Sequence, residues 1–257
     1  MDKQLFKVGE TYYKLVHKEY DDELIGEKVW ELLETIDKQD FKKQSETVLK
    51  EILSDIHFCT FRGSYNLKII HFLENNHFRF VDDYLTMLCL KKQFTPIINK
   101  IQLSIDIVIG EPNEQIKQSI LNIESSVIDF STFQSDYRID AAISIKRNLI
   151  RVASYFKKEN HLVFLIKHNE TYGGFFQFII ENNKAIGVNA AISSKMQNFL
   201  LGPVLYSFAI EYMFNAYSYV NAVECGLGFN NLRVLNIFQK MNFKIINREV
   251  HLRKVKQ

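Results

Sequence analysis

A long-range repeat constrains the fold of this chain more than any other feature of its sequence. The segment from Asn66 to Arg79 matches the segment from Asn231 to Lys244 at a constant offset of 165 residues, with identical asparagine, leucine and phenylalanine positions. Each copy reads as an asparagine-capped helix followed by an aromatic strand. Because the repeat occurs only twice, it predicts two α/β lobes rather than a solenoid. Chance similarity between two amphipathic helices is the alternative interpretation.

Composition is compatible with such a fold and excludes several classes of protein. The chain has 257 residues, of which 47% are hydrophobic, enough for one large core or two smaller ones. A formal charge of +2 gives no reason to expect nucleic acid or an acidic membrane as a partner. Three scattered cysteines without a CxxC pair predict no metal site and a reducing compartment. A charged N-terminus and no run of eighteen apolar residues predict a soluble, cytoplasmic protein.

Hydrophobic periodicity gives a coarse map of the elements. We expect helices over residues 24–36, 40–56, 66–76, 114–125, 143–156, 202–217 and 230–241. We expect strands over residues 57–61, 78–90, 101–109, 161–167, 174–181, 185–192, 219–225 and 243–255. The short connection between residues 167 and 174 predicts an antiparallel hairpin.

The stretch from Ala185 to Tyr217 carries the most chemical information. It reads as a strand, a polar loop over residues 193–198, and a helix that begins near Gly202 and Pro203. Proline is favoured in the first helical turn, where a missing N–H costs nothing. Free backbone N–H groups and the positive end of the helix dipole make such a helix start a site for an anion. An ordinary strand–turn–helix connection is the alternative.

Beyond these patterns, the order of elements in the C-terminal half resembles the GNAT N-acetyltransferase family. That family's pyrophosphate motif, Gln/Arg-x-x-Gly-x-Gly/Ala, lies over the segment Gln197–Gly202, and its late motif, Asn-x-x-Ala-x-x-x-Tyr-x-x-x-Gly-Phe, lies over Asn231–Phe243. More narrowly, the chain resembles the sugar-nucleotide branch typified by TDP-fucosamine acetyltransferase. The segments that carry this narrower likeness are Asp21–Gly26, Phe72–Asp82, Ser135–Asp140 and Val250-His251.

The resemblance implies an α/β (α+β) GNAT acyl-CoA N-acyltransferase fold with a mixed central sheet flanked by helices. It also implies a division of the chain: a truncated GNAT-like lobe over residues 1–110, a connecting helix or linker over 111–129, and a catalytic GNAT domain over 130–257. The implied reaction transfers an acetyl group from acetyl-CoA, with no metal, to the amine of an amino sugar. That sugar is expected to be nucleotide-linked and to serve cell-surface polysaccharide (lipopolysaccharide or O-antigen) synthesis. A homodimer is one assembly compatible with the resemblance.

Cofactor-binding residues follow from the resemblance position by position. Backbone N–H groups near the end of the strand would polarise the thioester carbonyl, those of the loop and helix start would bind the pyrophosphate, and Asn231 would contact the pantetheine arm. For Asn231 a purely structural N-cap is the alternative. The complete predicted set is Ala190, Ala191, Ile192, Gln197, Leu200, Leu201, Gly202, Pro203, Asn231 and Phe238.

The resemblance places catalytic and substrate-binding residues elsewhere in the chain. His251, with an ordinary pKa near neutrality, is a candidate general base, and Glu224 could orient an amine through water. A packed histidine and an exposed glutamate are the alternatives. Substrate contacts are predicted for Tyr137, Arg138, Asp140 and Asn189, with a solvated loop and an Asp140 helix start as the alternative for the first three. Asp136 stands where the sugar-nucleotide branch usually has arginine.

Two residues depart from the family pattern at positions that bear on activity. Leu200 occupies the first glycine of the pyrophosphate motif, where a small residue lets the backbone approach the ligand. Phe238 replaces the tyrosine that protonates the departing thiolate in the family, a step of the kind that contributes ~10²–10⁴ in rate. A catalytically weak or inactive GNAT relative that binds a ligand or partner is therefore the alternative function.

Overall fold

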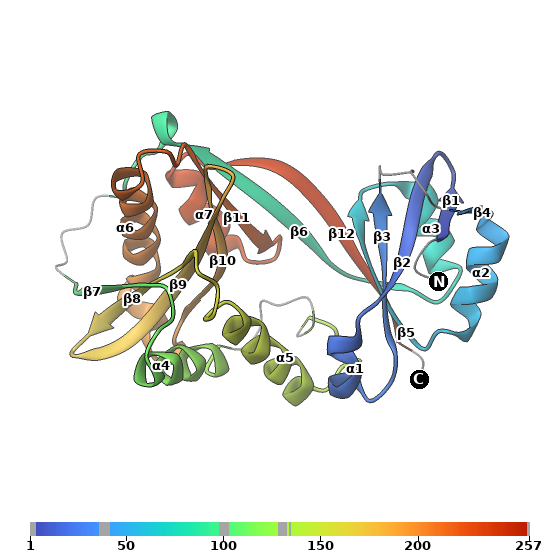
Figure 1. The fold of residues 1–257 in the computed structure, drawn as a ribbon, viewed down its shortest axis with the longest axis horizontal. Helices are drawn as coiled ribbons and strands as arrows, with labels where there is room; N and C mark the ends of the chain where they lie inside the picture. The colour runs from blue at the N-terminus through green and yellow to red at the C-terminus, as the bar shows by residue number, and fades with distance from the viewer. Residues whose placement is uncertain (1–3, 36–41, 98–102, 128–132, 134, 256–257) are drawn as a thin grey trace. The chain divides into compact units, whose positions relative to one another are not determined.

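The computed structural model describes residues 4–35, 42–97, 103–127, 133 and 135–255. The chain divides into two compact units (Figure 1), each of which is discontinuous in sequence. Unit 1 comprises Met1–Tyr84, Thr132–Ser144 and Arg248–Gln257, and unit 2 comprises Leu85–Ser131 and Ile145–Asn247. Among the helices of the described residues, none is both long enough and apolar enough to span a bilayer. The contiguous domain boundaries at residues 110 and 130 stay a prediction.

Unit 1 is built on strands of a mixed sheet with helices packed against them. Its strands are hydrogen-bonded in the order β4-β1-β2-β3-β5-β12, with β3 parallel to β5 and β12 antiparallel to β5. The elements are β1 (Gln4–Val8), β2 (Thr11–His17), α1 (Glu19–Ile25), β3 (Val29–Thr35), β4 (Lys42–Gln44), α2 (Glu46–Asp55), β5 (Phe58–Ser64), α3 (Leu67–Glu74), the start of β6 (Arg79–Leu90) and the end of β12 (Lys244–Val255).

Alternating strand residues give unit 1 its core. Side chains of α2 and α3 pack on one face of the strands, because period-2 alternation places every second strand residue on that face. This cluster contains Phe6, Tyr13, Leu32, Leu49, Leu53, Phe61, Ile69, Leu73, Val250 and Leu252. A second, smaller cluster contains the strand residues Val29 and Phe58 together with Phe133. The C-terminal strand therefore contributes buried side chains to a core built mainly from the N-terminal residues.

Unit 2 contains parallel and antiparallel strands that are hydrogen-bonded in the order β6-β11-β10-β9-β8-β7. Two hairpins, β8–β9 and β9–β10, have two-residue turns at Asn169-Glu170 and Asn182-Asn183, all four with positive φ, as type I′ turns require. The predicted antiparallel hairpin is thus confirmed. The elements are β7 (Ile105–Ile109), α4 (Glu114–Ser125), α5 (Ala141–Ser154) from Ile145 onward, β8 (His161–His168), β9 (Thr171–Glu181), β10 (Lys184–Ile192), η2 (Ser194–Phe199), α6 (Leu201–Ala216), β11 (Ala222–Gly228) and α7 (Leu232–Lys240), together with the 3₁₀ turn η1 (Lys91–Gln93).

Helices cover both faces of the unit 2 sheet. One face packs against α6 and α7 through residues such as Phe164, Phe176 and Phe178. The opposite face packs against α4 and α5 through Val163, Leu165, Phe175 and Ala191. Adjacent residues of β8 therefore enter opposite cores, as the pleat dictates. Figure 1 shows α6 and α4 on either side of the β8–β9–β10 hairpins.

The internal repeat is present in the structure down to its caps and turns. Asn66 and Asn231 each cap a helix by accepting a backbone N–H, from Lys68 and Val234 respectively. The residue before each aromatic position, His77 or Asn242, has a positive φ of 69° or 65°. Strands β6 and β12 then run for twelve residues each.

The last strand of each copy is divided between the two units. From Leu85 onward β6 belongs to unit 2, whereas β12 belongs to unit 1 from Arg248 onward. Each repeat thus contributes the end of its last strand to the unit built mainly by the other repeat.

The predicted helix over residues 24–36 is wrong. The structure has a short helix, α1, that ends at Ile25, and a strand, β3, over Val29–Thr35. Gly26 adopts a left-handed φ of 83° and its N–H bonds to the carbonyl of Asp22, which ends the helix. Strand β3 then pairs with β2 on one side and β5 on the other, so long-range pairing overrides the local pattern. Residue 36 lies outside the described residues.

Candidate functional site

Pairing between two neighbouring parallel strands of unit 2, β10 and β11, ends part-way along β10, and we call the stretch where it has ended the opening. Pairing of β10 with β11 covers only Lys184–Gly187, opposite Ala222–Cys225. The register of β10 against β9 shifts between Gly187 and Asn189, as a β-bulge produces. Beyond that bulge β10 continues to Ile192 without a further β11 partner among the described residues. Backbone groups on this edge of β10 are therefore available to a ligand that lies between the strands.

Helix α6 begins a few residues after the open edge. Its first turn contains no acidic side chain and its N-cap, Leu200, makes no side-chain cap bond. Free backbone N–H groups in such a turn favour an anion. The loop that leads into the helix is the 3₁₀ turn η2, which includes Gln197. The predicted helix start at Gly202 and Pro203 is confirmed, with Leu201 as the first helical residue.

Glycines near this helix start fall into two kinds. A Cβ on Gly173 would lie 2.4 Å from the sulfur of Met196, and a Cβ on Gly174 would lie 2.3 Å from Ile192, so these two glycines permit close packing within the fold. A Cβ on Gly202 would meet its neighbours only at 3.7–4.0 Å, in ordinary contact. Alanine would favour the helix by ~1 kcal/mol at such a position. The fold itself therefore does not require glycine at 202, which is compatible with close approach by a ligand.

The side chain of Leu200, just before α6, is not packed in the core. Its φ of 56° places it in the left-handed region, and its side chain is 61% exposed. Left-handed backbone costs a residue with a Cβ ~1–2 kcal/mol, which gives a physical reason for glycine at this motif position in the family.

The backbone conformation of Leu200 leads to a stability prediction. Replacing Leu200 with glycine should raise the free energy of unfolding by up to ~1 kcal/mol, because relief of the left-handed strain is partly offset by the larger entropy of the unfolded chain. Urea denaturation of the two proteins measures this difference. A less stable glycine variant would contradict the assignment of strain to this residue.

The remaining predicted cofactor residues lie in unit 2. Ala190 is exposed between two buried neighbours, Asn189 and Ala191, and Ile192 ends the strand. Asn231 caps α7 through its side-chain oxygen, so the structural role considered for it is confirmed. Phe238 is 3% exposed and its ring packs against Tyr206 and Phe243. Direct contact of these residues with a cofactor stays a prediction.

Glu224 and Asn189 occupy the strands on either side of the opening. Glu224, on β11, forms an ion pair with Lys184 of β10, with 3.2 Å between the carboxylate and the ammonium group. Asn189 is 6% exposed and its Nδ2 donates to Oε1 of Gln177 at 2.9 Å. The Oδ1 atom of Asn189 is buried and has no hydrogen-bond partner in the described part of the chain. Such an atom costs ~1–3 kcal/mol unless a ligand or water supplies a donor.

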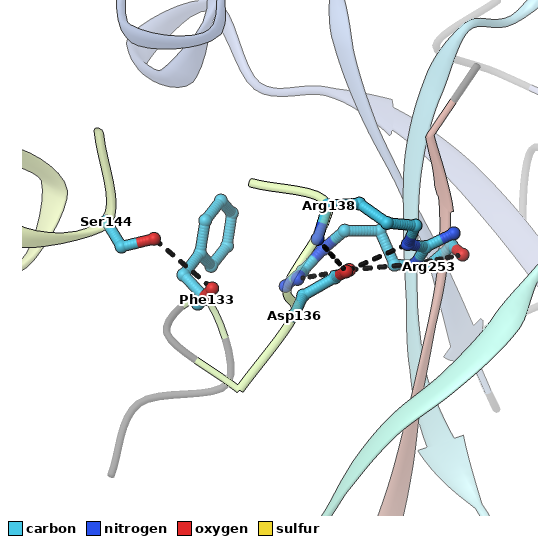
Figure 2. A network of polar contacts seen from close by, with 5 residues as sticks. All are labelled: Phe133, Asp136, Arg138, Ser144 and Arg253. Atoms are coloured by element: carbon cyan, nitrogen blue, oxygen red, sulfur yellow. Dashed lines mark hydrogen bonds and ion pairs between the residues drawn. The ribbon is translucent and has the colours of Figure 1, made fainter. Parts of the chain in front are cut away.

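Three of the predicted substrate residues lie in unit 1, close to a buried ion-pair network. Figure 2 shows Arg138 bound to Asp136 through two hydrogen bonds of 2.8 Å, while Arg253 reaches the same carboxylate at 3.0 Å. Burial would raise the pKa of Asp136, but the hydrogen bonds and charges of the two arginines hold it below its ordinary value. The guanidinium of Arg138 also donates to the carbonyl of Arg253. Both arginines are therefore already engaged within the protein.

The neighbours of Arg138 have separate positions. Tyr137 is 81% exposed. Asp140 accepts the backbone N–H of Ala142 at 2.7 Å at the start of α5, which confirms the helix-start interpretation given as its alternative. The substrate contacts predicted for Tyr137, Arg138 and Asp140 stay predictions.

His251 also lies in unit 1, on β12 opposite Arg62 of β5. Its ring stacks on Tyr84, with 5.7 Å between the ring centroids. Burial, assisted by the charges of Arg62 and Arg253, lowers the pKa of His251 to about 3. The ordinary pKa assumed for this histidine from sequence is therefore wrong, and a base this weak is poorly suited to take a proton near neutral pH. Its role as a general base stays a prediction that this value disfavours.

The low pKa of His251 makes stability depend on pH in a defined direction. Between pH 3 and 6.5 the unfolded chain binds a proton that the folded chain does not, so this residue makes stability fall as the pH is lowered through that window. The His251→Phe variant keeps a ring against Tyr84 and should lose this dependence. We expect the stability difference between wild type and variant to change by up to ~1.4 kcal/mol per pH unit, measured by urea denaturation. A constant difference from pH 4 to 7 would refute the assignment.

Sequence reasoning overlooked several buried polar residues in unit 2. Gln177 stands within the apolar strand β9, and His161 starts β8, both fully buried. Burial raises the pKa of Glu124 on α4, against the opposing charge of Arg151. The single glutamine in the apolar run from Phe175 to Ile180 is the one signal that sequence offered for this group.

Comparisons with known proteins bear on this arrangement at the level of the fold. No family model and no curated protein matches the chain. A conserved protein of unknown function from Staphylococcus epidermidis aligns with a TM-score of 0.64 and 10% identity, over 96% of this chain and 91% of that one. A GCN5-related N-acetyltransferase from Kribbella flavida aligns with a TM-score of 0.58 and 10% identity, over 98% and 90%. A tandem GNAT protein from the clavulanic acid biosynthesis pathway aligns with a TM-score of 0.57 and 10% identity, over 96% and 80%.

These alignments cover nearly the whole chain. The chain therefore has the mixed α/β GNAT fold, as predicted from sequence. Identities of this size establish the fold alone.

Proposed function

We propose that the chain is an acetyl-CoA-dependent N-acetyltransferase. The observation that carries the proposal is the open edge of β10 beyond Gly187, followed within a few residues by the uncapped start of α6. One structural element thus offers donors to a thioester carbonyl and the next offers donors to a pyrophosphate. The GNAT fold of the chain makes this pairing the expected position of an acyl-CoA.

The residues around the opening fit coenzyme A on three counts. The first turn of α6 has no acidic side chain that would repel a pyrophosphate. Gly202 has no packing role that requires a glycine. Ala190 is a small exposed residue beside the open strand edge, so the pantetheine arm would meet little steric obstruction there. Backbone N–H groups of residues 190–192 and 200–203 would hold the cofactor, which supplies an activated acetyl group.

In the overall reaction the amine nitrogen bonds to the acetyl carbon and the carbon–sulfur bond breaks. One proton leaves the amine and one ends on the thiol. Phe238 has no hydroxyl with which to protonate the thiolate, so water or another residue would supply that proton. Among the predicted groups, Glu224 is paired with Lys184 and His251 has a low pKa, so neither is a ready base.

We further propose an amino sugar, nucleotide-linked and used for cell-surface polysaccharide, as the acceptor. Support for this finer assignment comes from the sequence likeness to the sugar-nucleotide branch. A catalytically weak relative that binds a ligand or partner is the alternative, favoured by Leu200 and Phe238 at two motif positions.

A thiol-release assay with acetyl-CoA tests the activity and the acceptor together. The acceptors are TDP- and UDP-linked amino sugars, free amino sugars and simple alkylamines. We expect release that depends on an amine and is strongest with a nucleotide-linked amino sugar. Strongest release with an alkylamine would refute the sugar assignment, and amine-independent background throughout would favour the non-catalytic alternative.

A further inference from the structure

Three buried side chains form a continuous hydrogen-bonded relay across β8, β9 and β10 in unit 2. Nδ1 of His161 lies 3.1 Å from the carbonyl oxygen of Gly110, and Nε2 of His161 lies 3.2 Å from Nε2 of Gln177. Oε1 of Gln177 accepts from Nδ2 of Asn189 at 2.9 Å. His161 and Gln177 are fully buried and Asn189 is 6% exposed. We call these three residues the β8–β10 relay.

The relay has one consistent set of donors and acceptors. A carbonyl oxygen only accepts, so Nδ1 of His161 must carry the proton that Gly110 receives. Burial lowers the pKa of His161, which keeps the ring neutral and leaves Nε2 as an acceptor. Gln177 must then donate through its nitrogen and accept through its oxygen. The Asn189 amide is then oriented with its nitrogen toward Gln177. Its oxygen, Oδ1, takes no part in the relay.

The remaining oxygen, Oδ1 of Asn189, belongs to the part of β10 that follows the bulge. Asn189 comes directly after the bulge that follows the last β10–β11 pair, in the part of β10 that has lost its β11 partner. Its side chain lies on the face that packs against α4 and α5, since it pairs with Gln177, whose Nε2 also reaches the carbonyl of Val152 on α5. The Oδ1 atom is buried without a partner among the described residues.

We propose that Asn189 Oδ1 is the hydrogen-bond acceptor that positions the amine of the acyl acceptor. The assignment rests on the proposed N-acetyltransferase function. An acceptor-only oxygen selects a ligand N–H or O–H and repels an anion, so the acceptor substrate presents an amine rather than a carboxylate at this point. Asn189 cannot take a proton, and it acts by holding the nitrogen in place. Gln177 and His161 are positioning residues that act through it.

Nitrogen-15 NMR of the whole protein tests the relay and its ligand without requiring turnover. The spectrum of His161 should show a proton on Nδ1 and none on Nε2. D-glucosamine, the amine probe, is titrated with and without saturating coenzyme A, and 2-deoxy-D-glucose, which has a hydrogen in place of the amine, is the matched control. We expect the Asn189 side-chain amide signal to shift with glucosamine and to stay in place with 2-deoxy-D-glucose, which offers no donor at that position.

Kinetics of two variants provide the second test. Asn189→Leu should raise the KM for the amine at least tenfold while the Kd for coenzyme A changes less than twofold. Gln177→Met should have the same direction of effect if it acts through Asn189, which covers the case in which one variant does not fold. Asn160→Leu is the control, because the Asn160 side-chain amide donates to the backbone carbonyl of Ile180 on β9 at 2.8 Å but lies outside the relay.

The outcomes separate this inference from the proposed function. Failure to bind acetyl-CoA would overturn the proposed function. If the Asn189 side-chain amide signal does not shift with glucosamine, either with or without coenzyme A, this inference is overturned. A bound water would then be the only partner of Oδ1. Acetyl transfer with an unchanged KM for the amine in both relay variants would also overturn it, while leaving the proposed function intact.

Discussion

Replacing Asp136 with asparagine should lower the free energy of unfolding by about 3–5 kcal/mol at pH 7. The carboxylate is buried in unit 1 and is the shared partner of Arg138 and Arg253. An amide in its place leaves two buried guanidinium groups without a negative charge. Arg253 also lies 4.1 Å from the centre of the Phe133 ring, so its displacement would disturb the smaller core of unit 1.

Urea denaturation measures this loss, and two comparisons sharpen it. The exposed pair of Lys7 and Glu10 is the control, because Glu10→Gln should leave the unfolding free energy unchanged within error. The pKa of Asp136 lies below its ordinary value, so its contribution is present above about pH 4 and disappears as acid protonates it in the folded state. An Asp136→Asn variant as stable as Glu10→Gln would show that the network is not the stabilising feature described here.

The second large effect concerns the start of α6. Gly202→Trp should weaken coenzyme A binding at least a hundredfold, about 2.7 kcal/mol, because an indole would occupy the space where the pyrophosphate approaches the backbone. Gly202→Ala is the matched control for folding. Its Cβ meets neighbours only at 3.7–4.0 Å, so the alanine variant should be as stable as wild type or more so.

Calorimetry and thermal unfolding together decide this prediction. A tryptophan variant that melts like wild type but does not bind the cofactor supports the site. Unchanged affinity for coenzyme A in the tryptophan variant would show that the pyrophosphate binds elsewhere and would refute the assignment of its site to the start of α6.

Much of the fold was predictable because local signals agree with it. The asparagine caps at 66 and 231, the offset of 165 residues and the strand–loop–helix from Ala185 all appear in the structure at the expected places. The strand over Val29–Thr35 was not predictable locally, since its pairing with β5 joins residues about thirty positions apart. The exchange of the ends of β6 and β12 between units also depends on distant pairing that no short pattern encodes.

The candidate site likewise has parts that sequence predicts and parts that it does not. The loop and helix start could be found from sequence, because glycine, proline and a polar loop mark them over a few consecutive residues. The relay could not, because His161, Gln177 and Asn189 meet only through the register of two hairpins. Arg253 contacts both Arg138 and Asp136 from more than a hundred positions away. Sequence alone therefore gave Arg138 a role at the substrate that its buried contacts do not favour.

Isothermal titration of the protein with acetyl-CoA tests the central claim most directly. The account predicts saturable binding with one site per chain at or below near-millimolar cofactor, weakened by Gly202→Trp and retained by Asn189→Leu. Absence of binding at near-millimolar acetyl-CoA would contradict the account, because the open edge of β10 and the start of α6 would then not form an acyl-CoA site.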